Sequence, residues 1–382
     1  MGKLLLLLLP QAVSLLGSSI AQFGIIWTLT LDYSSGKVLL LSSLAMFIPQ
    51  IALMLLSGVL SDGRKRKSVI ILSDAVSSLV AVFLILAISY GRDSIAVFII
   101  SLAIRSACSG LQSPAVDSAV ALMAEDGRRE KANGMRGLLS SAVMLLSPVL
   151  AGLLLPAAGV SGLMAIDAVT ALLAICALIP LHLPESLSSS SSLSSGIRYA
   201  ISDSLIRRML VFHFIALFLI SPGAALTPLL VARVHGGGES LLALSEAAYS
   251  FGMVAGGLVL SFGVYTGNRK RGIAVSLFVY ALMLVVAGLS PFFMLYTLIN
   301  AIIGFVSPRY TAFMNSEIQD ECEVEMMGRV MSFLAVVTSS AIPCGLLVAA
   351  PLADILDIRI VFIVFGLLAG LHALFFALRD LR

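Results

Sequence analysis

Twelve long apolar stretches dominate the sequence, and each is long enough to cross a lipid bilayer as a helix of about 20 residues. None of them alternates polar and apolar residues as a strand of a membrane barrel does. The sequence therefore predicts an all-α membrane protein with twelve transmembrane helices. The first six stretches cover about residues 4–31, 38–60, 68–90, 95–123, 137–158 and 161–181, and the last six cover about residues 209–231, 241–264, 272–289, 291–314, 330–351 and 360–378.

The composition agrees with a membrane location. Hydrophobic residues make up 59% of the 382 residues and charged residues only 12%. Soluble domains carry about 25% charge, so this chain lacks the polar side chains that a soluble surface needs. These proportions exclude a soluble enzyme, a disordered protein and a nucleic-acid-binding protein, and the expected partner is the lipid bilayer.

The sequence carries none of the common enzyme signatures. It has no G-x-x-x-x-G-K-[ST] loop for ATP, and neither an H-E-x-x-H nor a G-x-S-x-G motif. The four cysteines are scattered without a C-x-x-C pair, which indicates neither a metal site nor a disulfide framework. We therefore expect no enzymatic activity, no cofactor and no metal. Any work must draw on a gradient of an ion or of the substrate.

Lysine and arginine are distributed unevenly between alternate connecting segments. If the amino terminus is cytoplasmic, the cytoplasmic segments hold 18 of the 24 Lys and Arg residues, and the external segments hold 4. Cytoplasmic loops of membrane proteins are enriched in these two residues. We therefore expect a multi-pass protein of the plasma (inner) membrane with both termini in the cytoplasm.

A polar segment near the midpoint, residues 184–205, is rich in serine and has the composition of a flexible linker. It predicts two six-helix domains, residues 1–183 and residues 206–382. Similar tripeptides, Gly-Met-Arg and Gly-Arg-Val, open the fifth and the eleventh apolar stretch, as an internal repeat would. Two parallel six-helix halves are typical of secondary transporters that bind substrate near the membrane midplane.

The segment between the second and third stretches carries a charged motif. Gly58, Asp62, Arg66 and Lys67 stand at the spacing G-x-x-x-D-x-x-x-R-K. Gly58 permits close helix packing, and the basic residues suit a cytoplasmic loop, but a generic loop explains neither Gly58 nor Asp62. This spacing resembles the signature of the major facilitator superfamily. The resemblance implies the twelve-helix fold of that superfamily and a conformational role for these residues.

Further short motifs resemble the macrolide-efflux branch of that superfamily, whose members are drug:proton antiporters. They include Gln112–Ala115 and Gly328–Val330, and their order along the chain strengthens the resemblance. Pro148 and Gly152 are similar to the antiporter motif G-P-x-x-G-G, although serine and alanine replace two of its glycines. The resemblance implies export of amphiphilic compounds or siderophores, driven by protons.

Ionisable residues at membrane depth are costly, and they are functional candidates by default. Arg105 lies near the middle of the fourth stretch and fits either a coupling or substrate role or a structural ion pair. Asp167 fits proton binding or capping equally well. Glu246 could bind and release a proton if it faces an apolar cavity, or stay hydrated near the outer end of its helix. We expect proton coupling at Glu246, Arg105 and Asp167.

Polar side chains recur at helical spacing on several stretches, where they are candidates for lining a substrate cavity. A polar stripe is unfavourable against lipid, so it should face protein or water. Asp74 and Asp117, near the inner ends of their helices, are expected to brace the motif at residues 58–67. The cavity candidates are Gln11, Ser14, Ser18 and Gln22 in the first stretch, Ser109 and Gln112 in the fourth, and Tyr249 and Met253 in the eighth.

Three functions remain open from the sequence. The main expectation is a monomeric secondary transporter that exports an amphiphilic small molecule, a drug-like compound or a siderophore, against protons. A metabolite uniporter or importer is the first alternative, and a membrane sensor or scaffold that transports nothing is the second. An antiporter needs a titratable group in its cavity, so Glu246 and Arg105 discriminate between these readings.

Overall fold

The computed structural model describes residues 2–60, 66–123, 129–181, 193–262, 268–323 and 326–380. Within these ranges the chain forms thirteen α-helices and no strand. The helices fall into two compact units, and each is described by itself below. The first unit comprises residues 1–32 and 41–190, and the second comprises residues 33–40 and 191–382. The predicted domain limits at residues 183 and 206 stay a prediction.

The helices of the first unit begin and end close to the predicted apolar stretches. α3 packs against both α4 and α5. The buried apolar core includes Leu7, Ile70, Ala115 and Leu178, so it draws on α1, α3, α4 and α5. The five helices are α1 (Gly2–Tyr33), α2 (Gly36–Leu60), α3 (Arg66–Ser89), α4 (Ile95–Met123) and α5 (Arg129–Leu178).

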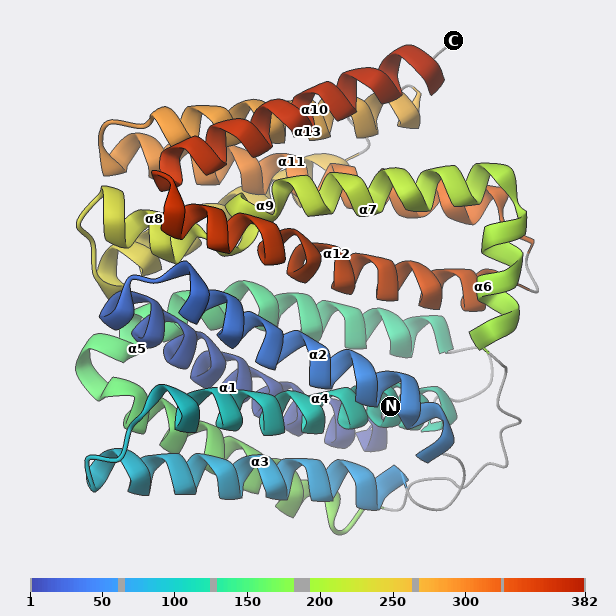
Figure 1. The fold of residues 1–382 in the computed structure, drawn as a ribbon. Helices are drawn as coiled ribbons and strands as arrows, with labels where there is room; N and C mark the ends of the chain where they lie inside the picture. Colours follow the sequence, from blue (N-terminus) through green and yellow to red (C-terminus); the bar gives the residue numbers. More distant parts are fainter. Residues whose placement is uncertain are drawn as a thin grey trace. The chain divides into compact units, whose positions relative to one another are not determined.

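Helix α5 contains the fifth and sixth predicted stretches together. At about 1.5 Å per residue its 50 residues would be far longer than the hydrocarbon core of a bilayer. The backbone leaves helical geometry at Gly159, where φ is 62° and ψ is 179°. Glycine adopts this backbone readily because it has no Cβ. The chain reverses direction there, so α5 supplies two crossings (Figure 1).

The second unit contains eight helices. Within it α9 packs against α11, α10 packs against α11 and α13, and α7 packs against α12. Side-chain caps start two of the helices: Asp203 accepts hydrogen bonds from the amides of Leu205 and Ile206, and Asn268 caps α10. The helices are α6 (Leu193–Ser202), α7 (Ser204–Ala225), α8 (Thr227–Val234), α9 (Glu239–Ser261), α10 (Arg269–Leu289), α11 (Phe293–Glu321), α12 (Met327–Ile355) and α13 (Ile358–Asp380).

Two features of the second unit differ from a simple reading of the apolar stretches. The seventh stretch is divided at Leu226, where α7 ends and α8 begins. Pro228 lies in the first turn of α8, where a missing amide hydrogen costs nothing. The predicted linker also contains a short helix, α6, which packs against α7 and α12.

The described helices support the predicted number of crossings. Ten segments are long and apolar enough to span a membrane, and the segment within α5 is one of them although it crosses twice. The predicted tenth stretch forms α11, a helix of 29 residues that is not among the ten. The fold is therefore that of an all-α, multi-pass membrane protein.

Candidate functional site

A buried carboxylate, Asp74 on α3, organises the polar network of the first unit. Its Oδ1 accepts hydrogen bonds from Ser14 Oγ at 2.9 Å and from Gln112 Nε2 at 2.9 Å, and its Oδ2 accepts one from Gln11 Nε2 at 3.3 Å. The three donors are neutral side chains on α1 and α4. The expectation that Asp74 braces residues 58–67 stays a prediction, because residues 61–65 lie outside the described residues.

The network borders a small cavity of about 110 Å³ in the first unit. Five of the predicted cavity residues line it, and their role in binding substrate stays a prediction. Gln22 lies one turn beyond Ser18 on α1, is half-buried and is not in the lining. Sites for drug-sized ligands usually measure about 300–1,000 Å³, so this cavity holds only a small part of such a ligand. The lining residues are Gln11, Ser14, Leu15, Ser18, Gln50, Ser109, Gln112, Ser113, Val116 and Arg136.

Two predicted coupling residues, Arg105 on α4 and Asp167 on α5, form a buried ion pair. Arg105 Nη1 donates to Asp167 Oδ2, and the two side chains are 7% and 0% exposed. Ser18 Oγ donates to Asp167 Oδ1 at 2.6 Å, and Arg105 Nη2 donates to the Ser18 carbonyl at 3.3 Å. Gly17 lets α1 approach Thr170 of α5 closely beside this pair. Ser18 therefore joins the ion pair to the cavity wall.

The second unit holds a separate cavity of about 150 Å³. Tyrosines from three helices, Tyr249, Tyr280 and Tyr310, contribute their rings and hydroxyls to its wall. Glu246 lies one turn before Tyr249 on α9 and is half-buried, and Met253 lies one turn after it and is also half-buried. Of these three predicted α9 residues, only Tyr249 is in the lining. The other lining residues are Leu217, Ile220, Ala224, Ser276, Leu277, Val306, Ser307, Thr311 and Ile342.

Beside this cavity His213 of α7 is buried with both ring nitrogens in contact with hydroxyls. Its Nδ1 lies 3.0 Å from Tyr310 Oη, and its Nε2 lies 2.9 Å from Thr338 Oγ1. The His213 and Tyr310 rings also stack, with centroids 5.7 Å apart. These contacts hold α7, α11 and α12 together behind the tyrosine wall.

The charged motif of the sequence is described only in part. Gly58 lies in α2, and Asp62 lies outside the described residues. Arg66 begins α3 and is 5% exposed, and its Nε and Nη1 have no hydrogen-bond partner in the described part of the chain. Lys67 Nζ donates to the Ile179 carbonyl at 2.6 Å, which ties the start of α3 to the end of α5.

The other predicted conformational residues lie on α4 and α5. Asp117 forms an ion pair of 2.5 Å with Arg136, which joins the C-terminal end of α4 to the N-terminal end of α5. Pro148 and Gly152 are buried within α5. Asp117 is exposed, so its pairing with Arg136 contributes little stability.

Sequence reasoning missed a polar clamp formed by Asp354 of α12 and Arg233 of α8. Asp354 accepts hydrogen bonds from the backbone amides of Gly36 at 2.7 Å and Lys37 at 2.9 Å, and Arg233 Nη2 donates to Asp354 Oδ1 at 2.7 Å. Arg233 also donates to the Ser34 carbonyl. This clamp is why residues 33–40 belong to the second unit. Gly36 and Asp354 lie 318 residues apart in the chain, so no short sequence pattern indicates that they are in contact.

Titratable residues outside these networks offer no metal centre. In the described part of the chain, no three His, Cys, Asp or Glu side chains gather closely enough to hold an ion. The polar groups that line the two cavities are instead hydroxyls and amides, with Arg136 as the one charged side chain among the described lining residues.

Known proteins match this chain along nearly its whole length. The chain is 27% identical over 370 residues to macrolide efflux protein A of Streptococcus pyogenes, covering 94% of this chain and 91% of that protein. It is 25% identical over 401 residues to the multidrug efflux pump Tap of Mycobacterium tuberculosis (strain ATCC 25618 / H37Rv), covering 99% of this chain and 90% of that protein. Both relatives therefore match along nearly their full length.

Solved structures share the fold at low sequence identity. A bacterial homolog of the human lysosomal transporter Spinster aligns with a TM-score of 0.74 at 14% identity, over 98% of this chain and 96% of that one. The nucleoside transporter NupG aligns with a TM-score of 0.73 at 13% identity, over 98% of each chain. The family model of the Major Facilitator Superfamily matches residues 7–340. The chain belongs to the Major Facilitator Superfamily, and it is a membrane transporter and not an enzyme.

Proposed function

We propose that this chain exports amphiphilic, drug-like molecules from the cell in exchange for protons, by alternating access. The names of the macrolide and multidrug efflux relatives support the substrate class. The distribution of Lys and Arg supports an inner-membrane location with both termini in the cytoplasm. Nothing in the proposal requires more than one copy of the chain, so the working unit is a monomer.

The observation that carries the proton part is the setting of Asp74. This carboxylate is 2% exposed, and the three side chains that donate to it, Gln11, Ser14 and Gln112, are all neutral. A buried charge without a cationic partner is costly, and a proton removes that cost. Two of these donors, Gln11 and Ser14, lie with Ser18 along one face of α1, and all three residues line the cavity. Proton binding at Asp74 would therefore change the hydrogen bonding of the groups that face substrate.

The roles of the other charged residues follow from the same reasoning. Arg105 compensates the charge of Asp167, so in this conformation the pair is structural. Movement of Ser18 or of α1 would alter the hydrogen bonds of this pair. We therefore propose that Arg105 and Asp167 take part in coupling after a proton binds to Asp74. Glu246 adds a carboxylate beside the tyrosine-lined cavity of the second unit. Substrate contacts are proposed at both cavities, with Tyr249 supplying an aromatic surface.

Inverted membrane vesicles test the proposal. An imposed proton gradient, acidic inside, should drive uptake of erythromycin or ethidium by wild-type vesicles, and a proton ionophore should abolish it. Asp74→Asn should abolish gradient-driven uptake while exchange of labelled for unlabelled substrate continues, because a neutral amide keeps the site but carries no proton. Asp93→Asn, which alters an exposed carboxylate in the loop before α4, is the matched control and should transport like wild type.

Other outcomes separate the alternatives. Uptake that ignores both the gradient and Asp74→Asn would contradict antiport and favour a uniporter. Loss of coupling in Glu246→Gln with normal coupling in Asp74→Asn would move the proton site to the second unit. A folded protein that moves no tested compound in either direction would contradict efflux and favour an importer of another compound or a non-transporting sensor.

A further inference from the structure

A larger cavity lies at one end of the second unit, away from the polar networks described above. It measures about 350 Å³ and is bordered by α7, α10 and α13. Lys270 lies in the first turn of α10, Arg208 in the first two turns of α7 and Arg379 in the last turn of α13. On the proposed orientation these ends meet the cytoplasmic surface of the membrane.

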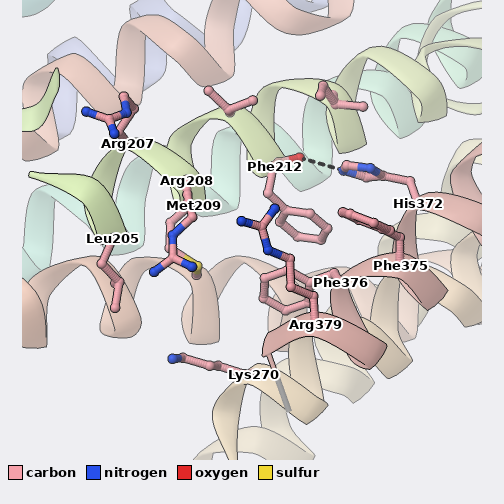
Figure 2. A pocket seen from close by; sticks show the side chains of 12 residues that line it. Leu205, Arg207, Arg208, Met209, Phe212, Lys270, His372, Phe375, Phe376 and Arg379 are labelled. Carbon is pink, nitrogen blue, oxygen red and sulfur yellow. Dashed lines mark hydrogen bonds between the residues drawn. The ribbon is translucent and has the colours of Figure 1, made fainter. Parts of the chain in front are cut away.

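Four cations line this cavity, and three of them lie together. Figure 2 shows Arg208, Lys270 and Arg379 directed into the same space, whereas Arg207 lies apart from them. Arg207 Nη1 donates to the Ile201 carbonyl at 2.6 Å, and Arg208 Nε donates to the Ser204 carbonyl at 3.2 Å. None of the described residues that line the cavity is acidic. The site thus combines concentrated positive charge with no negative side chain in its described wall.

Deeper in the cavity the wall is aromatic and apolar. Phe212 of α7 stacks on Phe376 of α13 with ring centroids 4.1 Å apart, and His372 Nε2 lies 3.1 Å from the Phe212 carbonyl (Figure 2). Val211 and Phe375 also line the cavity and are 53% and 60% exposed. Phe212 and His372 each lie eight residues from their helix ends, about 12 Å deep. On the proposed orientation, this distance from the helix ends would place the two side chains at the level of lipid acyl chains.

We propose that this cavity binds one anionic phospholipid of the cytoplasmic leaflet. Its phosphate would lie among Arg208, Lys270 and Arg379, and the start of an acyl chain would lie along Phe212 and Phe375. The complementary charge selects an anionic headgroup, since basic pockets between transmembrane helices on the cytoplasmic side are suited to such lipids. The exposed apolar wall selects a lipid over a soluble phosphate compound.

The binding of lipid to delipidated protein in dodecyl maltoside tests this proposal. The protein is mixed with equal amounts of phosphatidylglycerol and phosphatidylcholine of the same chain length, and bound lipid is counted by native mass spectrometry. We expect one phosphatidylglycerol to be retained in preference to phosphatidylcholine. Each cation near a membrane surface is worth about a fivefold change in affinity. Lys270→Gln should therefore weaken phosphatidylglycerol binding about fivefold, and Lys270→Gln with Arg379→Gln about 25-fold.

Two controls separate charge at this site from general effects. Arg271→Gln removes the neighbouring exposed charge on α10, which does not line the cavity, and should leave binding within twofold of wild type. Lys270→Arg keeps the charge and should also bind normally. This variant would show that position 270 tolerates substitution even if the double variant unfolds. Equal retention of the two lipids by wild type would overturn the proposal. So would normal binding in Lys270→Gln, or displacement of the lipid by an equal concentration of glycerol 1-phosphate.

This site rests on the proposed orientation but not on the proposed substrate. Failure of lipid binding would leave drug–proton exchange untouched, because the cavity shares no lining residue with the polar network of Asp74. Failure of proton coupling would equally leave the lipid site in place. The two experiments therefore fail independently.

Discussion

Asp74 and Asp167 are both buried in the first unit, but their surroundings differ in charge. Asp167 accepts from Arg105 and Ser18, whereas the described donors to Asp74 are neutral. Compensated and uncompensated carboxylates should respond differently to neutralisation. Losing the charge of Asp74 removes a proton site, and losing the charge of Asp167 leaves a buried arginine without its partner.

The ion pair gives a prediction about stability. Arg105→Met should lower the stability of the folded protein by about 3–5 kcal/mol, because it leaves Asp167 as an uncompensated buried charge. The double variant Arg105→Met with Asp167→Leu should recover most of that loss, because no unpaired charge remains. Thermal unfolding of the purified protein in detergent measures both. A double variant less stable than Arg105→Met would contradict this account of the pair.

His235, which follows α8 outside the membrane-spanning segments, gives a prediction about pH. Burial lowers the pKa of His235, and the positive charge of Arg359 lowers it further. The unfolded chain then binds this proton more readily, so stability is full above about pH 6.5 and falls as the pH drops below it. The ring lies between Phe293 and Tyr296, and its Nε2 has no hydrogen-bond partner in the described part of the chain.

The measurement is the melting temperature of wild type and His235→Asn between pH 8 and pH 5. The difference between the two curves isolates this residue from the other histidines. Wild type should lose more stability than the variant as the pH falls below about 6.5, and the two should run parallel above it. Parallel curves over the whole range would show that His235 is not held in its neutral form.

At the scale of elements, close packing of α9 on α11 depends on small residues. A Cβ at Gly252 or Gly256 would collide with the α11 backbone at Ala301 or Phe305, and one at Gly304 would collide with the carbonyl of Tyr249. Such small residues at four-residue spacing let helices approach closely in membranes. This packing fixes Tyr249, on α9, in the wall of the tyrosine-lined cavity.

Adjacent glycines make a matched test of that packing. Gly256→Ala should destabilise the protein by about 1–3 kcal/mol, because its Cβ would be forced against Phe305. Gly257→Ala is the control, since nothing lies within 4 Å of its Cβ and alanine favours a helix by up to about 1 kcal/mol. Gly256→Ala should lower the melting temperature, and Gly257→Ala should raise it or leave it unchanged. Similar melting temperatures would rule out close packing of α9 on α11.

The elements were largely predictable from hydrophobic length, and the exceptions have identifiable physical causes. The fourth stretch was predicted over 95–123 and forms α4 with those bounds. The division at Leu226 was missed because the stretch is apolar overall despite Thr227 and Pro228, and hydrophobicity alone cannot locate a change in direction. Helix α6 was missed because a serine-rich composition favours a linker, whereas packing against α7 and α12 stabilises a helix there.

Within the site, sequence identified surfaces better than partners. Helical spacing placed Gln11, Ser14 and Ser18 on one face of α1, and all three line the same cavity. The sequence marks Arg105 and Asp167 separately as ionisable residues in apolar stretches, whereas the structure pairs them between α4 and the second half of α5. Pairing across helices depends on tertiary packing, which one sequence does not encode in any short pattern.

At the scale of the whole molecule, the chain forms two compact units, and one short segment from the first half of the sequence belongs to the second unit. Residues 33–40 belong to the second unit because Asp354 accepts the amides of Gly36 and Lys37 at the start of α2. A carboxylate there satisfies amides that a helix start leaves unpaired. One short segment is thus fixed to the second unit while the rest of α1 and α2 belongs to the first.

The central claim is that transport of an amphiphile is exchanged for protons. The most direct measurement is the pH inside proteoliposomes that hold the purified protein and a trapped pH-sensitive dye, after erythromycin is added outside without any imposed gradient. Entry of the drug should expel protons and raise the internal pH, and Asp74→Asn should abolish the change while the drug still exchanges. Net drug entry through the wild-type protein with no change in internal pH would contradict the account.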